Sequence, residues 1–163
     1  MKKYRSFALA AAFSLILDQL SKGYIDTHFA IGESHRVIEN FFHITYVRNP
    51  GAAFGMLADS GFRLPFFLAI SSIAIIGILW YSRRLAADKQ WQLTALGLIL
   101  SGAVGNMIDR LRFGEVIDFL DAHWYSHHWP AFNVADSAIC IGVGIMLLCT
   151  WHEEKQRKQQ PTP

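Results

Sequence analysis

The chain has 163 residues, of which 52% are hydrophobic and only 17% are charged. Soluble globular domains carry about 25% charged residues, so this composition argues against an ordinary water-soluble protein. The formal net charge of +2 is small and the basic residues form no stripe among aromatic ones, so we expect no nucleic acid partner. The length predicts a single domain, residues 1–163.

Four stretches, in chain order, predict helices that cross a membrane: residues 6–25, 64–82, 90–109 and 135–152. A helix needs about 20 predominantly apolar residues to span the hydrocarbon core of a bilayer. The last three carry no charge through most of their length, whereas the first contains Asp18 and Lys22. The sequence therefore predicts a mainly α-helical, polytopic protein with four transmembrane helices, surrounded by membrane lipids.

Basic residues gather on one side of these helices if the helices run up and down. They precede the first helix, connect the second to the third and follow the fourth: Lys2, Lys3, Arg5, Arg83, Arg84, Lys89, Lys155, Arg157 and Lys158. Cytoplasmic ends of membrane helices carry an excess of Lys and Arg, so we expect both termini in the cytoplasm. A cleavable signal peptide begins in a similar way, but no small-residue cleavage site clearly ends the first apolar run.

Two longer connections then lie on the outer side. The first contains a β region at residues 29–60, where the β-branched and aromatic run 37–48 predicts a strand or a short hairpin. A turn is predicted at residues 49–51. The second connection, 111–133, is rich in aromatic residues that are typical of a membrane interface. The polar and charged tail, 153–163, is expected to be disordered.

Up-and-down topology converts sequence positions into depths and brings polar residues together at the outer ends of the helices. They come from separate places in the chain: Asp18, Lys22, Asn106, Asp109, Arg110, Asp118 and Asp136. Ionisable groups within a membrane are costly, so each of them needs a partner or a function. Their convergence on one layer predicts an active site near the outer interface.

Several of these residues also have a structural explanation. Asp18 and Lys22 have the i, i+4 spacing of a helical ion pair. Asp109 and Arg110 suit interfacial anchors, and an acid at position 136 is favoured by the dipole of the helix that it begins. These explanations stay open beside a role in a site.

Asp118 is harder to explain in this way, because its neighbours are apolar and no basic residue stands at helical spacing from it. If Asp118 and Asp136 meet in space, repulsion and desolvation keep one carboxyl protonated and leave the other as a base. Such a pair can activate water for amide hydrolysis. Asp109 and Asp121 are rival carboxylates.

Other chemistries find less support in the sequence. Cys140 and Cys149 are nine residues apart on one predicted helix, so no disulfide joins them. His123, His127 and His128 suggest metal ligation, but no cysteine pattern or HExxH motif accompanies them, and we predict no metal. The GxSxG element and the nucleotide-binding loops are absent from the sequence, so we expect no cofactor.

Five motifs, in order along nearly the whole chain, resemble those of the bacterial lipoprotein signal peptidases, also called signal peptidase II. They are DQLSK (18–22), RNPGAAFG (48–55), GAVGNMIDR (102–110), VIDF (116–119) and FNVADSA (132–138). One small departure is Ser101, where a glycine is common in the family.

The resemblance implies an aspartyl endopeptidase of the bacterial inner membrane, with four transmembrane helices and a small extracytoplasmic β-sheet that cradles the substrate. Its catalytic pair corresponds to Asp118 and Asp136. Supporting positions, which hold the substrate backbone or the pair, or maintain the structure, correspond to Asn49, Gly51, Asn106, Arg110, Asn133, Asp18, Lys22 and Asp109. The implied substrate is a prolipoprotein that is cleaved just before its diacylglyceryl-modified cysteine. Globomycin is the expected inhibitor, and a monomer is the expected state.

Two other functions are compatible with charges among membrane helices. A small transporter or channel component would line a pathway with them. Such a pathway needs polar residues through the full depth of the membrane, yet the second, third and fourth helices are uncharged through their middle and inner portions. A scaffold would use the charges only to join helices, and replacement of the carboxylates distinguishes it from a peptidase.

Overall fold

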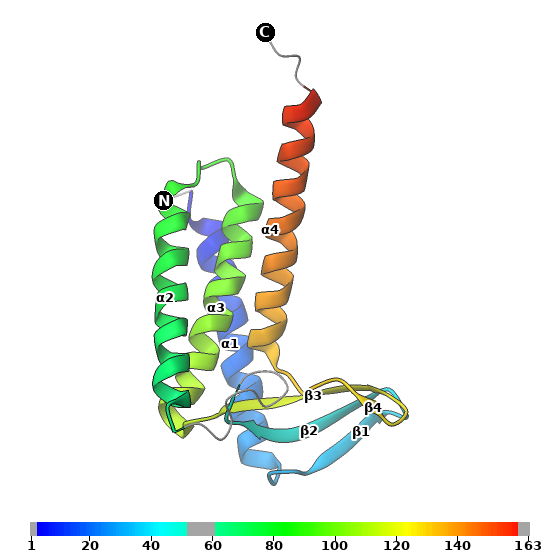
Figure 1. The fold of residues 1–163 in the computed structure, drawn as a ribbon. Coiled ribbons are helices and arrows are strands. Elements are labelled where there is room, and N and C mark those ends of the chain that lie inside the picture. Colours follow the sequence, from blue (N-terminus) through cyan, green and yellow to red (C-terminus); the bar gives the residue numbers. More distant parts are fainter. Residues whose placement is uncertain (1–2, 52–60, 160–163) are drawn as a thin grey trace.

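The computed structural model describes residues 3–51 and 61–159, which form four helices and a small antiparallel sheet (Figure 1). The helices are α1 (Arg5–His28), α2 (Arg63–Arg84), α3 (Gln90–Phe113) and α4 (Val134–Gln159). The strands are β1 (Ser34–Ile38), β2 (Phe42–Asn49), β3 (Val116–Trp124) and β4 (His127–His128). They pair in the order β1-β2-β3-β4. The mainly helical class with a small sheet, which the sequence predicts, is confirmed.

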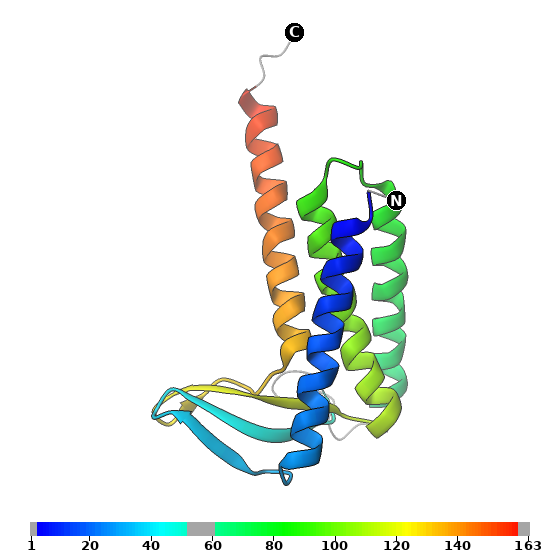
Figure 2. The same ribbon diagram turned by 180° about the vertical axis from the view of Figure 1, so that it is seen from behind.

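The helices lie side by side and alternate in direction (Figures 1 and 2). The start of α1 and the end of α4 lie at the end of the bundle that is opposite the sheet. α3 packs against each of the other three helices. Among the described residues, α2, α3 and α4 are long and apolar enough to cross a membrane, judged by length and composition. Up-and-down packing thus gathers one end of every helix beside the sheet.

Small residues allow α3 to approach its neighbours closely. A Cβ atom on Gly102 would clash with the carbonyl oxygen of Ala135 in α4, and one on Gly97 would clash with the carbonyl oxygen of Phe7 in α1. Glycines of this kind let helix backbones meet inside a membrane, where van der Waals packing supplies much of the attraction. α3 then ends at Gly114, whose φ of 73° gives the left-handed cap that glycine adopts without strain.

The sheet begins with the predicted hairpin, since β1 and β2 lie within residues 29–60. Its other two strands lie within residues 111–133, the second of the longer connections, where the sequence predicted no strand. In the β2–β3 ladder, two residues of β2, Thr45 and Tyr46, stand opposite one residue of β3, Phe119. This bulge bends the strand, as an extra residue does in an antiparallel pair.

The sheet is attached to α1 by an apolar cluster and a polar contact. Ile25 of α1 packs with Tyr46, Ile117 and Phe119. Asp26, one residue further along α1, accepts hydrogen bonds from the hydroxyl of Tyr46 at 2.5 Å and from the guanidinium of Arg48 at 2.7 Å. These contacts fix the position of β2 and β3 relative to the helices.

Two expectations need correction or restriction. Residues 153–159, expected to be disordered, continue α4, where Glu153 accepts hydrogen bonds from Lys89 at 2.8 Å and Gln92 at 3.0 Å, which anchors this extension beside the start of α3. Residues 52–60, which include the second half of the RNPGAAFG motif, lie outside the described residues, as do 160–163.

Candidate active site

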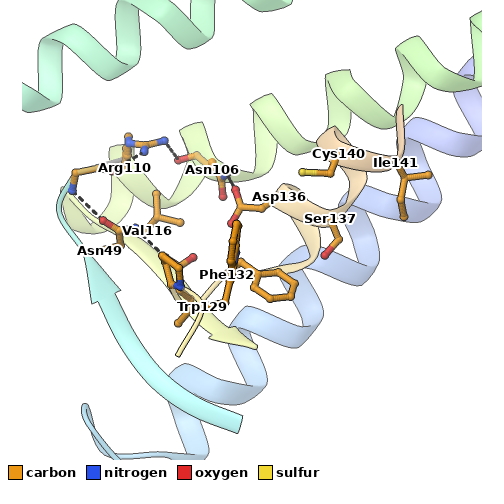
Figure 3. Close-up of a pocket in the computed structure, with 14 residues that line it drawn as sticks. Asn49, Asn106, Arg110, Val116, Trp129, Phe132, Asp136, Ser137, Cys140 and Ile141 are labelled. Atoms are coloured by element: carbon orange, nitrogen blue, oxygen red, sulfur yellow. Dashed lines mark hydrogen bonds between the residues drawn. The ribbon is translucent and has the colours of Figure 1, made fainter. Parts of the chain in front are cut away.

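A cavity of about 620 Å³ lies where the sheet meets the ends of α3 and α4 (Figure 3). Six residues that the sequence singled out line it: Asn49, Gly51, Asn106, Arg110, Asp118 and Asp136. Apolar and aromatic residues form much of the remaining wall, among them Val116, Trp129, Phe132 and Ile141. The cavity thus combines a polar group of side chains with a largely apolar surface.

Asp136 stands in the first turn of α4, where a reciprocal cap holds it. Asn133 precedes the helix, and its side-chain oxygen accepts a hydrogen bond from the backbone N–H of Asp136 at 2.9 Å. In return, the carboxylate of Asp136 accepts from the backbone N–H of Asn133 at 3.2 Å. This is the geometry of a capping box, with Asn and Asp in the two capping positions. The start of α4 therefore fixes the orientation of the Asp136 carboxylate.

Asp118 projects from β3 and is buried, with 2% of its surface exposed. Its two oxygens accept hydrogen bonds from the side-chain amides of Asn133 at 2.7 Å and Asn49 at 2.9 Å. Burial raises the pKa of Asp118 to about 7, and the nearby charge of Asp136 adds to the increase, while the two amide hydrogen bonds oppose it. Asp118 is therefore able to hold a proton near neutral pH.

Asparagine side chains connect the two carboxyl groups. Asn133 contacts both of them, because its side-chain amide donates to Asp118 and its backbone N–H donates to Asp136. Asn106 of α3 donates to Asp136 at 2.7 Å, and its own oxygen accepts from Asn133 at 3.2 Å. Figure 3 shows Asn106 and Asp136 pointing toward one another from their two helices. The structure thus brings Asp118 and Asp136 to the wall of one cavity.

A buried ion cluster lies behind this wall. The ammonium of Lys22 is 3.0 Å from Asp18 and 2.9 Å from Asp109, and it donates to Asn106 at 2.9 Å. Asp18 also accepts from the backbone N–H of Ala135, in the first turn of α4, at 2.8 Å. The i, i+4 pair that the sequence left open is present, and it is part of a larger cluster that joins α1, α3 and α4. Buried charges need such partners.

Arg110 reaches the cavity from the last turn of α3. Its guanidinium lies over the ring of Phe67 in α2, 4.6 Å from the ring centre, and donates to the carbonyl oxygen of Gly51 at 3.2 Å. Asp109, the preceding residue, turns inward and accepts from the backbone N–H of Ile117 in β3 at 3.2 Å. The two neighbours therefore have different environments, one beside the cavity and one in the buried cluster.

Sequence reasoning missed some residues of this region. Gln19 donates to Asp18 at 3.1 Å and to Asp109 at 3.4 Å, and its place inside the DQLSK motif was the available signal. Ser137 and Cys140 line the cavity one turn apart on α4. The sequence does not tell which face of α4 is turned toward the cavity, so they could not be identified from it. Asp121, a rival carboxylate in the sequence, does not line this cavity.

Known proteins resemble this chain over nearly its whole length. The family model described as signal peptidase (SPase) II matches residues 10–152. The chain is 49% identical to the lipoprotein signal peptidase of Syntrophotalea carbinolica, over 94% of this chain and 95% of the relative. It is 50% identical to that of Geobacter sulfurreducens, over 94% and 96%. A solved structure of a bacterial membrane enzyme superposes with a TM-score of 0.86 at 35% identity, over 96% of this chain and 94% of the other. The chain belongs to the signal peptidase II family.

Proposed function

We propose that the protein removes the signal peptide from diacylglyceryl-modified prolipoproteins, cutting just before the lipidated cysteine, with Asp118 and Asp136 as its catalytic pair. Membership of the family makes it a peptidase of prolipoproteins in a membrane setting. The observation that supports the pair most directly is the bridging role of Asn133, which donates to Asp118 at 2.7 Å and to Asp136 at 3.2 Å beside one cavity. Two carboxyl groups held in this way suit acid and base roles in amide hydrolysis.

The two carboxyl groups have different roles in this proposal. Asp136, as the carboxylate, takes a proton from a water molecule, and the water oxygen attacks the carbonyl carbon of the scissile peptide bond. Asp118, whose pKa is raised to about 7, donates its proton to the carbonyl oxygen. Collapse of the tetrahedral intermediate breaks the C–N bond: one hydroxyl returns its proton to Asp118 as the carbonyl re-forms, and the proton held by Asp136 passes to the leaving nitrogen. Neither aspartate forms a covalent intermediate.

The polar neighbours position the pair and the peptide. Asn49 and Asn106 each donate to one carboxyl group, which keeps the two groups oriented for the reaction. Arg110 has its guanidinium beside the cavity, where it can donate to a carbonyl group of the substrate. Gly51, whose carbonyl oxygen accepts from Arg110, helps to hold that guanidinium in place.

The buried cluster supports the pair from behind. Asp18, Lys22 and Asp109 join three helices, and Lys22 contacts Asn106, which in turn contacts Asp136. The largely apolar remainder of the cavity wall suits the acyl chains of a lipidated cysteine. A substrate with a lipid anchor and a scissile peptide therefore matches both the apolar wall and the polar side chains of the cavity.

The membrane arrangement that fits this chemistry has all four helices crossing the inner membrane of a bacterium. Both termini are then cytoplasmic, because the basic clusters lie at the end of the bundle opposite the sheet. The sheet and the cavity face the periplasm, where the cleavage site of a translocated precursor is exposed. The chain acts as one domain and as a monomer, and globomycin inhibits it.

The test uses purified protein and a lipid-modified precursor whose cleavage is followed by gel mobility. Asp118→Asn and Asp136→Asn are each expected to lower the cleavage rate by about 10²–10⁴-fold, the usual contribution of a general acid or base. Asp88→Asn is the matched control, since Asp88 is exposed between α2 and α3 at the other end of the bundle. Thermal unfolding shows whether each variant is folded. Normal cleavage by either folded variant would refute the catalytic pair.

A further inference from the structure

One end of the sheet projects away from the helices (Figure 1), and four residues with metal-binding side chains belong to the strands there. His43 of β2 stands opposite Asp121 of β3, and His123 of β3 stands opposite His128 of β4. Residues directly opposite one another in an antiparallel ladder point to the same face. Asp121 and His123 are two residues apart on β3, and side chains at that spacing also share a face. The register therefore assembles His43, Asp121, His123 and His128 into one group.

The donor atoms of this group are nearly as close together as the ligand atoms of a metal site. One donor atom each from His43, Asp121 and His123 lies within 4.8 Å of the others. The rings of His43 and His123 have centroids 4.2 Å apart, and the ring of His128 stacks on His123 at 4.5 Å. Two ligand atoms at about 2.1 Å from a tetrahedral ion lie roughly 3.4 Å from each other. Side-chain rotations that shorten the longest of these distances by up to roughly 1.4 Å would bring the donor atoms to ligand spacing.

One atom of this group is buried without a partner. Nδ1 of His123 is covered from solvent, and within the described residues it makes no hydrogen bond. It lies 4.0 Å from an oxygen of Asp121, beyond hydrogen-bond reach, and His123 as a whole is only 7% exposed. A buried polar atom without a partner is costly, by about 1–3 kcal/mol, so such atoms usually have a ligand, a water molecule or a neighbour. This nitrogen is the second observation that points to a ligand.

The remaining contacts orient the carboxylate. One oxygen of Asp121 accepts a hydrogen bond from Thr45 at 3.0 Å, and Thr45 is in turn hydrogen-bonded to Ser34 of β1 at 2.8 Å. The other oxygen is 2.8 Å from Nδ1 of His128. Ligands in metal sites are commonly held by such outer contacts, which fix their direction. Asp121 thus has one oxygen held by the sheet and one directed toward the histidines.

We propose that His43, Asp121 and His123 bind a divalent first-row transition-metal ion of the Zn²⁺ type, with the half-exposed His128 able to supply a fourth ligand. Two or three imidazoles with one carboxylate suit Zn²⁺ better than Mg²⁺ or Ca²⁺, which prefer oxygen ligands. The bound ion joins β2, β3 and, through His128, β4. Its role is to stabilise the distal part of the sheet, since none of its ligands lines the cavity that contains Asp118 and Asp136.

This proposal revises the prediction that the sequence holds no metal site. The sequence drew attention to His123, His127 and His128, which are neighbours in the chain, but His127 pairs with Trp124 and therefore faces the other side of the sheet. The ligands that replace it, His43 and Asp121, are far apart in the sequence and meet only through the β2–β3 register.

The test measures Zn²⁺ binding by the full chain, purified without a histidine tag, treated with a chelator and titrated calorimetrically. Wild-type protein is expected to bind one Zn²⁺ per chain. His43→Asn and His123→Asn are each expected to weaken binding by at least about tenfold, since changes even to outer contacts cost 10–100-fold. His127→Asn is the matched control and is expected to bind as wild type does, because this neighbour lies on the opposite face.

A second measurement keeps the proposal testable if the asparagine variants do not fold. Zn²⁺ should raise the midpoint of thermal unfolding of the wild-type protein, a chelator should reverse the increase, and Mg²⁺ should have no such effect. Failure of the wild-type protein to bind Zn²⁺ at one ion per chain would overturn the proposal. An equal loss of binding in His127→Asn and His123→Asn would also overturn it, as would an unchanged midpoint.

Discussion

Two neighbouring helices, α2 and α3, look alike in sequence and behave differently in the structure. Both are long and apolar enough to cross a membrane. In the most apolar 18-residue stretch of each helix, however, 6% of the residues of α2 are buried inside the protein and 56% of those of α3. α2 exposes large apolar side chains such as Ile73 and Ile76. α3 buries small and polar residues, including Ser101, Gly102 and Asn106.

The difference shows what distinguishes an inner helix from an outer one in a protein of this kind. In a bilayer, large apolar side chains can face lipid without penalty, so apolarity does not select the inner helix. Close packing and hydrogen bonding select it, and these need small and polar residues. α3 meets both needs, and the polar end of α3 supplies Asn106 and Arg110 to the candidate active site.

The largest expected change in stability comes from Lys22 of α1, whose ammonium pairs with Asp109 of α3. Lys22→Met leaves Asp18 and Asp109 buried without their counter-ion, which is expected to lower the free energy of unfolding by about 3–5 kcal/mol. Denaturation of the purified protein measures this loss. Lys89→Met is the control, because the ion pair of Lys89 with Glu153 is exposed and its removal should have no clear effect. Equal stability of the two variants would contradict the role given to the buried cluster.

A smaller effect is expected from matched glycines on the two helices. A Cβ atom at Gly105 of α3 would meet the carboxylate of Asp18, whereas one at Gly77 of α2 would meet nothing within 4 Å. Gly105→Ala should therefore destabilise the protein by about 1–3 kcal/mol and lower the cleavage rate, because Asp18 supports the start of α4. Gly77→Ala should be neutral or slightly stabilising, as alanine favours helix. The contrast between α2 and α3 fails if the two variants have the same unfolding midpoint.

The smallest expected effect is a dependence of the cleavage rate on pH. It should arise at the end of the bundle beside the sheet, since the apolar stretch 64–82 of α2 contains few titratable groups. Asp118 with a pKa of about 7 is protonated below that pH and loses its proton above it. In the acid role the protonated form is active, so kcat/KM should fall roughly fivefold between pH 7 and pH 8. Initial rates on a lipidated precursor between pH 6 and pH 9 measure this. The raised pKa of Asp118 also makes the folded state less stable as pH rises from 6 to about 8, because the unfolded chain ionises this carboxyl more easily. The unfolding midpoint is therefore recorded at each pH to show that the enzyme stays folded, and a flat or rising rate would remove Asp118 from the acid role.

Much of the fold could be predicted from the sequence because it depends on local patterns. The apolar run from Leu64 predicted a helix that begins within one residue of α2, and the β-branched run 37–48 predicted the hairpin. Small residues such as Gly102 are typical of close packing between membrane helices, and a Cβ atom at Gly102 would clash with the carbonyl oxygen of Ala135. The prediction of disorder for residues 153–159 was wrong. It was based on their polar composition, which gives no sign that Glu153 contacts another helix.

The candidate site was predictable in its members and not in its connections. Alternating directions of the helices were enough to group Asp118 with Asp136 at one end. The resemblance placed Asn133 among the supporting positions, but it did not predict that this residue would contact both carboxyl groups, because that contact depends on how β3 lies against the first turn of α4. The pairing of His43 with Asp121 is of the same kind, since the register between distant strands follows from the fold and not from local spacing.

The cap at the start of α4 has a practical consequence for trapping complexes. Asp136 orients a helix as well as facing the cavity, so its replacement by alanine would remove the cap together with the carboxylate. Asparagine retains an oxygen that can accept from the backbone N–H of Asn133, while its amide nitrogen replaces the oxygen that accepts from Asn106. Asp136→Asn is therefore the variant of choice for an inactive enzyme that still holds an uncut precursor, and for structural work on the loaded state.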